Sequence, residues 1–292
     1  QRPATKTTAR VETGGFATVM LRCLSLGLTL WAGAISAQTL EFVSATPITA
    51  EAATLGGLSA IETTDGSTAL TVSDRGQFFD LTLERDTAGN ITAARAAPSA
   101  KFTPSEHDTE GLAIGPSGAF AAFEGPATVR HINGAALPRH PDFRKMGSNA
   151  ALEALAIDAQ GRLFTLEEST GGADVPFALY MFSQGVWSKP HSIPRQHGFF
   201  PVGADFGADG RLYLLERQFT PFGFRSQIRR FDLDATPPTE TTLLTTYALQ
   251  HGNLEGIAVW QDANGATRIT MVSDNNFLPI QRNQVVEYLL SE

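Results

Sequence analysis

Acidic side chains recur at two fixed places in a repeated sequence pattern, which indicates that the fold gathers them at one site. One set heads a short phrase, an acid and a small residue followed by apolar residues, and comprises Glu110, Glu153 and Glu255. The other set follows the next apolar run after each phrase and comprises Asp74, Glu124, Glu167, Glu168, Glu216 and Asp274. Carboxylates that lie a few ångströms apart raise one another's pKa or require a cation. The pattern therefore predicts a site for a hard divalent cation.

Calcium is the cation that such oxygen ligands favour, because Ca²⁺ accepts about six to eight oxygens in a flexible geometry. Asn275, directly after Asp274, would add a neutral carbonyl oxygen. The predicted metal ligands are Asp74, Glu110, Glu153, Glu255, Asp274 and Asn275. The alternative is that each acid caps a strand end or pairs with the next arginine, as Glu216 would with Arg217. The residues alone leave both interpretations open.

Basic and imidazole side chains are interleaved with the acids, and together they suggest ester hydrolysis. A cation can polarise a phosphoryl oxygen and generate hydroxide, an arginine can neutralise charge, and a histidine or glutamate can move a proton. The predicted catalytic residues are Glu110, Glu255, His107, His251, Arg75 and Arg217. Other catalytic motifs are absent from the sequence, including Gly-x-Ser-x-Gly, the Walker-type loop and His-Glu-x-x-His. An anionic ester is therefore the predicted substrate.

The elements that must position these residues are strands of a repeating unit. The phrase occurs at residues 56–61, 110–114, 153–157, 202–206 and 255–259, with Gly56 and Val202 at the head of the first and fourth copies. Intervals of about 40 to 55 residues are typical of one four-stranded propeller blade. The predicted blades are 55–98, 110–140, 152–194, 202–248 and 254–290. We predict an all-β fold, a single β-propeller of about five blades, with six as the alternative.

Ring closure is the remaining requirement of this fold. The last repeat has three obvious strands, and the apolar segment 40–48 has no repeat of its own. We predict that this segment supplies the missing outer strand and closes the ring, which hides strand edges from aggregation. In a propeller the innermost strand begins, and the second strand ends, on the same face. Both sets of acids are therefore predicted at one mouth of the central channel.

The N-terminal residues are typical of an export signal. Met20 and Arg22 precede an apolar core at 24–35, and small residues end at Ala37. The core is too short to span a bilayer comfortably. We therefore divide the chain into residues 1–37, which are removed, and one domain at 38–292. The mature protein is expected in the periplasm or secreted, without membrane insertion.

The charge and the cysteine content exclude several classes of partner and of site. The chain carries a net charge of −8, and removal of residues 1–37 leaves 18 basic and 29 acidic residues, a net charge of −11. Such an acidic surface argues against a nucleic-acid partner and is compatible with divalent cations. The one cysteine, Cys23, lies in the signal, so a mature chain has no disulfide, thiol nucleophile or thiolate zinc site. We expect a monomer.

Several ordered motifs resemble one known family. They are Ser73-Asp74-Arg75-Gly76, Asp108-Thr109-Glu110-Gly111-Leu112-Ala113, Leu215-Glu216-Arg217, Asn253-Leu254-Glu255-Gly256-Ile257-Ala258 and Ser273-Asp274-Asn275-Asn276-Phe277. The set, which runs through residues 54–290, resembles the phytase-like family of exported bacterial proteins, described by the esterase-like activity of phytase. The resemblance implies a β-propeller and calcium-assisted hydrolysis of an ester or phosphoester.

These observations predict an exported, metal-dependent hydrolase of a small anionic ester, with a phosphoester first, acting at the acidic mouth. Two alternatives stay open because propellers serve many functions. One is a non-catalytic propeller that binds a ligand or an envelope protein. The other is a lactonase-type esterase that prefers a cyclic ester.

Overall fold

The computed structural model describes residues 38–50, 55–99, 108–147, 151–168, 172, 174–196, 198–278 and 280–291. They belong to one unit, residues 37–292. The predicted export signal and His107 lie outside the described residues. No helix in the described ranges has the length and apolar character needed to cross a membrane.

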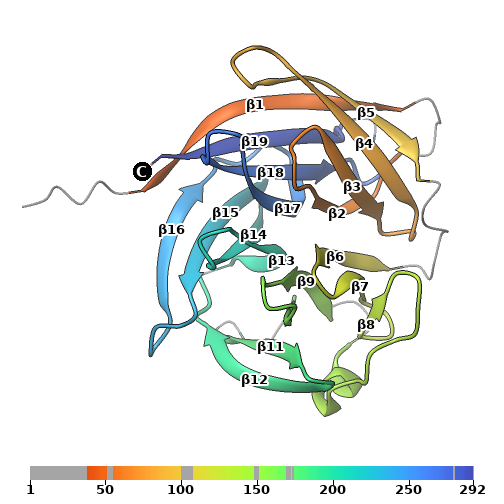
Figure 1. Cartoon of the computed structure of the whole chain (residues 1–292), viewed down its shortest axis with the longest axis vertical. Helices are drawn as coiled ribbons and strands as arrows, with labels where there is room; N and C mark the ends of the chain where they lie inside the picture. The colour runs from red at the N-terminus through yellow and green to blue at the C-terminus, as the bar shows by residue number, and fades with distance from the viewer. Residues whose placement is uncertain are drawn as a thin grey trace, which may run out of the picture. The chain divides into compact units, whose positions relative to one another are not determined.

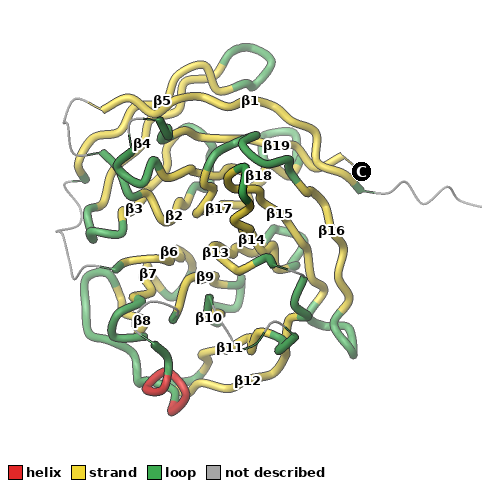
Figure 2. Tube along the Cα trace, turned by 180° about the vertical axis from the view of Figure 1, so that it is seen from behind, coloured by secondary structure: helices red, strands yellow, loops and turns green. Residues whose placement is uncertain are grey.

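The described residues are almost entirely strands and turns, as Figure 2 shows. Blade 1 contains β2 (Leu58–Glu62), β3 (Thr68–Ser73), β4 (Phe78–Arg85) and β5 (Ile91–Pro98). Blade 2 contains β6 (Thr109–Gly115), β7 (Gly118–Phe123) and β8 (Thr128–His131). Blade 3 contains β9 (Leu152–Ile157), β10 (Leu163–Glu167), β11 (Phe177–Ser183) and β12 (Val186–Ile193). Blade 4 contains β13 (Phe200–Phe206), β14 (Leu212–Thr220), β15 (Gly223–Asp232) and β16 (Thr239–Thr245). Blade 5 contains β17 (Asn253–Gln261), β18 (Thr267–Asp274), β19 (Gln284–Ser291) and β1 (Thr39–Ala50).

The innermost strands of the sheets meet around a common centre. In the described part of the chain β2, β6, β9, β13 and β17 contact one another in this order, and β17 contacts β2 again (Figure 1). The chain is therefore a β-propeller, as its repeats predict. The glycine of the repeat permits the close approach. A Cβ atom at Gly256 would lie 2.7 Å from the Cα of Ala60 on β2, and one at Gly203 would lie 2.8 Å from the Glu255 carbonyl oxygen.

The N-terminal strand closes the ring, which confirms the prediction for segment 40–48. Strand β1 pairs antiparallel with β19 from Thr39 opposite Ser291 to Pro47 opposite Gln284. Its last residues also pair in parallel with β5 and thereby join blades 5 and 1 in one eight-stranded sheet. The two ends of the domain thus hold each other in place.

Blade 2 departs from the predicted four strands, because only three are present among its described residues. Proline explains the difference, since Pro138 and Pro141 have no N–H to donate to a sheet. The segment instead forms a short 3₁₀ helix, Pro141–Lys145. Phe143 is buried there, and the indole N–H of Trp187 donates to the Pro138 carbonyl at 2.6 Å. This loop packs against blade 3 where an outer strand would end.

Candidate functional site

A β-bulge directs one residue of each innermost strand away from the strand ladder. The registers of β2, β6, β9, β13 and β17 each skip one residue against the neighbouring strand. The skipped residues are Ser59, Glu110, Glu153, Val202 and Glu255. Bulges re-aim side chains and are frequent beside functional sites. They also correct the alignment of the first repeat, because Ser59 rather than Gly56 stands in the place of the glutamates.

The bulges and the ends of two second strands line a cavity of about 180 Å³. Its polar lining consists of Asp74, Glu110, Glu153, Arg217, Glu255 and Asp274, with Ser59 and Asn276. The structure thus brings together five of the six predicted metal ligands and three residues of the predicted catalytic set. Their roles as ligands or catalysts stay predictions.

Arg217, which is half-buried, is the cation of this cavity. Its Nη1 donates to Glu255 Oε1 and, at 3.1 Å, to Asn253 Oδ1. Its Nη2 lies 3.3 Å from Glu168 Oε1. Asn253 also donates from its amide to Glu255 Oε1 at 2.6 Å. One guanidinium therefore balances two carboxylates and holds Glu255 in a fixed orientation.

The carboxylates of the cavity outnumber its one arginine, and their pKa values show the consequence. Burial, then the charges of Glu255 and Glu124, raise the pKa of Glu110 to about 9. Burial raises the pKa of Glu255 to about 7, although Arg217 opposes the shift. Burial and nearby carboxylates raise the pKa of Glu153 well above its usual range. The cavity thus contains more carboxyl groups than Arg217 alone can keep ionised.

Two aspartates on adjacent blades leave buried oxygens without partners. The Oδ1 atoms of Asp74 and Asp274 are buried and have no hydrogen bond among the described residues. Both carboxylates flank Gly57, because Asp274 accepts from its N–H and a Cβ there would lie 2.2 Å from Asp74 Oδ1. A side chain at Gly57 would fill this space. Unsatisfied buried oxygens of this kind are what a cation ligand set requires.

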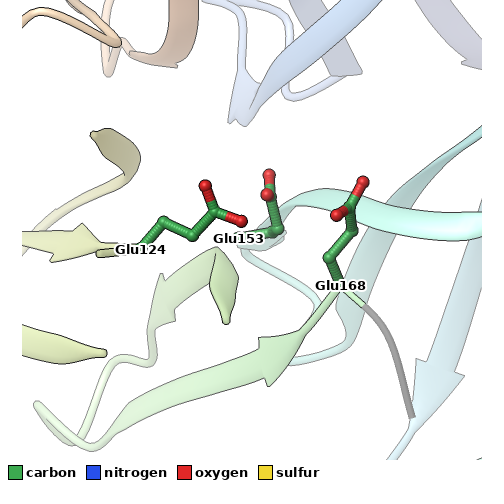
Figure 3. A group of neighbouring side chains, drawn as sticks. All are labelled: Glu124, Glu153 and Glu168. Atoms are coloured by element: carbon green, nitrogen blue, oxygen red, sulfur yellow. The ribbon is translucent and has the colours of Figure 1, made fainter. Parts of the chain in front are cut away.

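A second group of acids lies beside the cavity on blades 2 and 3. Glu124, Glu153 and Glu168 place carboxylate oxygens within 4.8 Å of one another. Figure 3 shows these three side chains. The sequence pattern placed Glu124 and Glu168 at the acidic mouth but did not include them among the metal ligands. Their positions after the apolar runs of β7 and β10 are the signal that could have identified them.

His251 lies away from the acidic cavity. It is buried, its ring stacks on Phe42 at 5.7 Å, and its Nε2 lies 2.6 Å from the Tyr288 hydroxyl. Phe42 and Tyr288 belong to the outer strands of blade 5, β1 and β19. Burial lowers the pKa of His251. The structure therefore does not bring this predicted catalytic residue to the carboxylates.

The predicted Asn275 and Arg75 are also engaged elsewhere. Asn275 Oδ1 accepts from the Phe277 N–H at 3.0 Å, and Asn276 lines the cavity in its place. The Arg75 guanidinium lies over the Phe277 ring at 3.7 Å from its centroid. Arg75 therefore stands beside Asp74 at the rim but does not line the cavity.

The predicted pairing of Glu216 with Arg217 is wrong. Successive residues of a strand point to opposite faces, so the two side chains on β14 diverge. Glu216 is fully buried and accepts two hydrogen bonds from Arg229, both at 2.6 Å. Glu167 likewise turns from the cavity, since its electrostatic neighbours are Asp142 and Lys189. The position of an acid at the end of a second strand is therefore not enough to make it a site residue.

Three solved structures are similar in fold. Regucalcin from Agrobacterium tumefaciens, titled a calcium-binding protein, is 11% identical over 84% of this chain and 97% of its own, with a TM-score of 0.44. A gluconolactonase from Xanthomonas campestris is 12% identical over 77% of this chain and 69% of its own, with a TM-score of 0.40. The WD40 β-propeller domain of Doa1 is 9% identical over 86% of this chain and 96% of its own, with a TM-score of 0.42.

No curated protein is significantly similar to the chain in sequence. Residues 53–277 match the phytase-like family, which is described by the esterase-like activity of phytase. This span includes all the acids of the cavity. The chain therefore belongs to the phytase-like family.

Proposed function

We propose that this protein is a divalent-cation-dependent hydrolase of a small anionic ester, with a phosphoester as the first choice. The observation that carries the proposal is the cavity at the bulged ends of the innermost strands. Carboxylates from blades 1, 2, 3 and 5 converge there on one half-buried arginine from blade 4, Arg217. Membership of a family described by esterase-like activity supports an ester substrate.

Asp74, Asp274 and Glu110 would hold the cation. The fit rests on the partnerless buried oxygens of Asp74 and Asp274 in the described residues. Glu110 enters from blade 2, next to blade 1, and the Ser59 hydroxyl of blade 1 hydrogen-bonds its carboxylate. A set of carboxylate oxygens without nitrogen or sulfur suits Ca²⁺.

A bound cation would polarise the ester oxygen and lower the pKa of a bound water molecule. Arg217 would neutralise the charge of the anionic ester, since a guanidinium recognises phosphate and carboxylate oxygens well. Glu255 is the residue we assign as proton acceptor. Its Oε1 is held by Arg217 and Asn253, which leaves Oε2 to receive the proton of an attacking water.

The test is a hydrolysis assay after removal of divalent cations with EDTA. We expect turnover of p-nitrophenyl phosphate that returns with Ca²⁺, Mg²⁺ or Mn²⁺. Glu255→Gln should lower kcat/KM by about 100-fold or more, because it removes the proton acceptor and keeps the size of the side chain. Glu41→Gln, an exposed change on β1, should keep full activity. A fully active Glu255→Gln protein would count against the assignment.

Two other outcomes decide between functions. Turnover of a lactone without turnover of the phosphoester would replace the proposal with a lactonase-type esterase. Cation binding without turnover of a phosphoester, p-nitrophenyl acetate or a lactone would favour a non-catalytic binding propeller.

A further inference from the structure

The acids of blades 2 and 3 form a cluster separate from the aspartates of blades 1 and 5. Glu124 follows β7, Glu153 occupies the bulge of β9, and Glu168 follows β10. One oxygen from each lies within 4.8 Å of the other two. Figure 3 shows the three side chains next to one another. Three elements of two blades thus present one small group of oxygens.

Glu153 is the member that requires a ligand. Only 7% of its surface is exposed, and its carboxylate has no hydrogen bond among the described residues. It nevertheless lines the cavity. A buried carboxylate without a partner is costly. Its charged neighbours are the carboxylates of Glu110, Glu168 and Glu255, with Arg217 as the opposing cation.

The other two members are both anchored on the backbone of one residue, Ala151. The N–H of Ala151 hydrogen-bonds the Glu124 carboxylate, and the Ala151 carbonyl accepts from the Glu168 N–H at 2.8 Å. Arg217 reaches Glu168 at Oε1, and Oε2 of Glu168 has no hydrogen bond among the residues that the structure describes. The oxygens are therefore positioned before any ligand arrives.

The charge of Arg217 does not satisfy this cluster. Its Nη1 is occupied by Glu255 and Asn253, and its Nη2 contacts a single oxygen of Glu168. Glu124 and Glu153 receive no bond from it. A group with more charge and more coordination positions is needed.

We propose that Glu124, Glu153 and Glu168 bind a Ca²⁺ ion of their own, in addition to the cation at Asp74 and Asp274. Three oxygens within 4.8 Å of one another are close enough to coordinate one cation. A set of carboxylate oxygens without nitrogen or sulfur, drawn from three separate elements, suits the flexible oxygen coordination of Ca²⁺. The ion bridges blades 2 and 3, and its binding does not depend on the proposed catalysis.

The test counts Ca²⁺ ions by calorimetric titration of the full chain after dialysis against EDTA. We expect two ions per wild-type chain and one ion fewer in Glu153→Gln and in Glu124→Gln. The matched control is Glu167→Gln, which changes the residue next to Glu168 that faces Asp142 and Lys189 instead. It should bind as many ions as the wild type. Unchanged stoichiometry and affinity in both cluster variants would overturn the proposal.

Melting temperatures distinguish a metal-binding role of Glu153 from a purely structural one. Glu153→Gln in EDTA should melt at the wild-type temperature or above, because one charge leaves a repulsive group. Its calcium-induced rise should be smaller than that of the wild type. A lower melting temperature in EDTA with an unchanged calcium-induced rise would show that Glu153 is structural and would refute the site. Asp274→Asn distinguishes the two proposals, since it should lose the other ion and keep this one.

Discussion

The residue at the bulge of each innermost strand determines which side chain that blade contributes to the acidic end of the channel. Three blades place a glutamate there, blade 1 a serine and blade 4 a valine. Since the bulged residue is unpaired in the ladder, its identity can change without loss of backbone hydrogen bonds. The chemistry of the cavity is thus set by single positions on an otherwise uniform frame.

The small residue after the bulge is a packing requirement, which Gly256→Ala tests. The new Cβ would lie 2.7 Å from the Ala60 Cα, a backbone atom that cannot rotate away. We expect a loss of about 1 to 3 kcal/mol in the free energy of unfolding, measured by urea denaturation. Gly147→Ala is the control, because a Cβ there meets nothing within 4 Å. Equal stability of the two variants would contradict the packing argument.

At this scale the sequence predicts a site residue when that residue occupies a fixed place in a repeat. It does not predict which residue far away in the chain will be its partner. Glu110, Glu153 and Glu255 are predictable because each heads an apolar phrase. The partners of Arg217 are not, since Glu255 and Glu168 lie 38 and 49 residues away in the chain. Strand alternation was available in the sequence and would have separated Glu216 from Arg217.

At the scale of elements, two of the innermost strands also carry a second pair of acids, which is buried. Glu62 ends β2, and Asp205 lies near the end of β13. Burial raises the pKa of Asp205 to about 7, although the N–H groups of Val259 and Phe206 oppose it. Burial and the charge of Asp205 raise the pKa of Glu62 well above its usual range. Both strands therefore carry a group that is more easily ionised in the unfolded chain.

This pair predicts that Glu62→Gln flattens the pH dependence of stability. Because the folded protein raises the pKa of Glu62 well above its usual range and that of Asp205 to about 7, the folded state binds more protons than the unfolded chain above about pH 4. The stabilisation is complete below about pH 4 and is lost as the pH rises through about 7. Urea denaturation at pH 5 to 8 should show a smaller loss in Glu62→Gln than in the wild type.

The exposed Glu84→Gln on β4 provides the comparison and should follow the wild-type curve. Equal pH slopes in Glu62→Gln and the wild type would show that the buried pair does not control this dependence.

Element prediction succeeded where pattern and chemistry agree. The strands of blades 1, 3 and 4 follow the repeat, because their turns contain glycine and their runs are apolar. The missing outer strand of blade 2 was foreseeable only from Pro138 and Pro141. Its replacement by a loop that contacts Trp187 depends on long-range packing, which a local pattern does not encode.

At the scale of the whole domain, one ionic network links the first and last blades across the closure. Glu287 on β19 is fully buried and accepts from both terminal nitrogens of Arg85 on β4, each at 2.7 Å. It also accepts from Arg268 at 2.9 Å and from the Thr270 hydroxyl at 3.0 Å. Closure by β1 was predictable because an unpaired strand and an incomplete blade lie at opposite ends. The network was not, since Arg85 and Glu287 are 202 residues apart in sequence.

Glu287→Gln should therefore weaken the whole ring rather than one blade. Loss of the carboxylate charge leaves Arg85 and Arg268 without their shared buried anion, which typically costs about 3 to 5 kcal/mol. Because closure couples the first blade to the last, far-ultraviolet circular dichroism and tryptophan fluorescence should report one common transition at lower urea concentration. Glu84→Gln, which removes an exposed charge from the same β4 strand, should shift the midpoint little. If Glu287→Gln unfolded at the wild-type midpoint, the closure would be held by strand pairing between β1 and β19 alone.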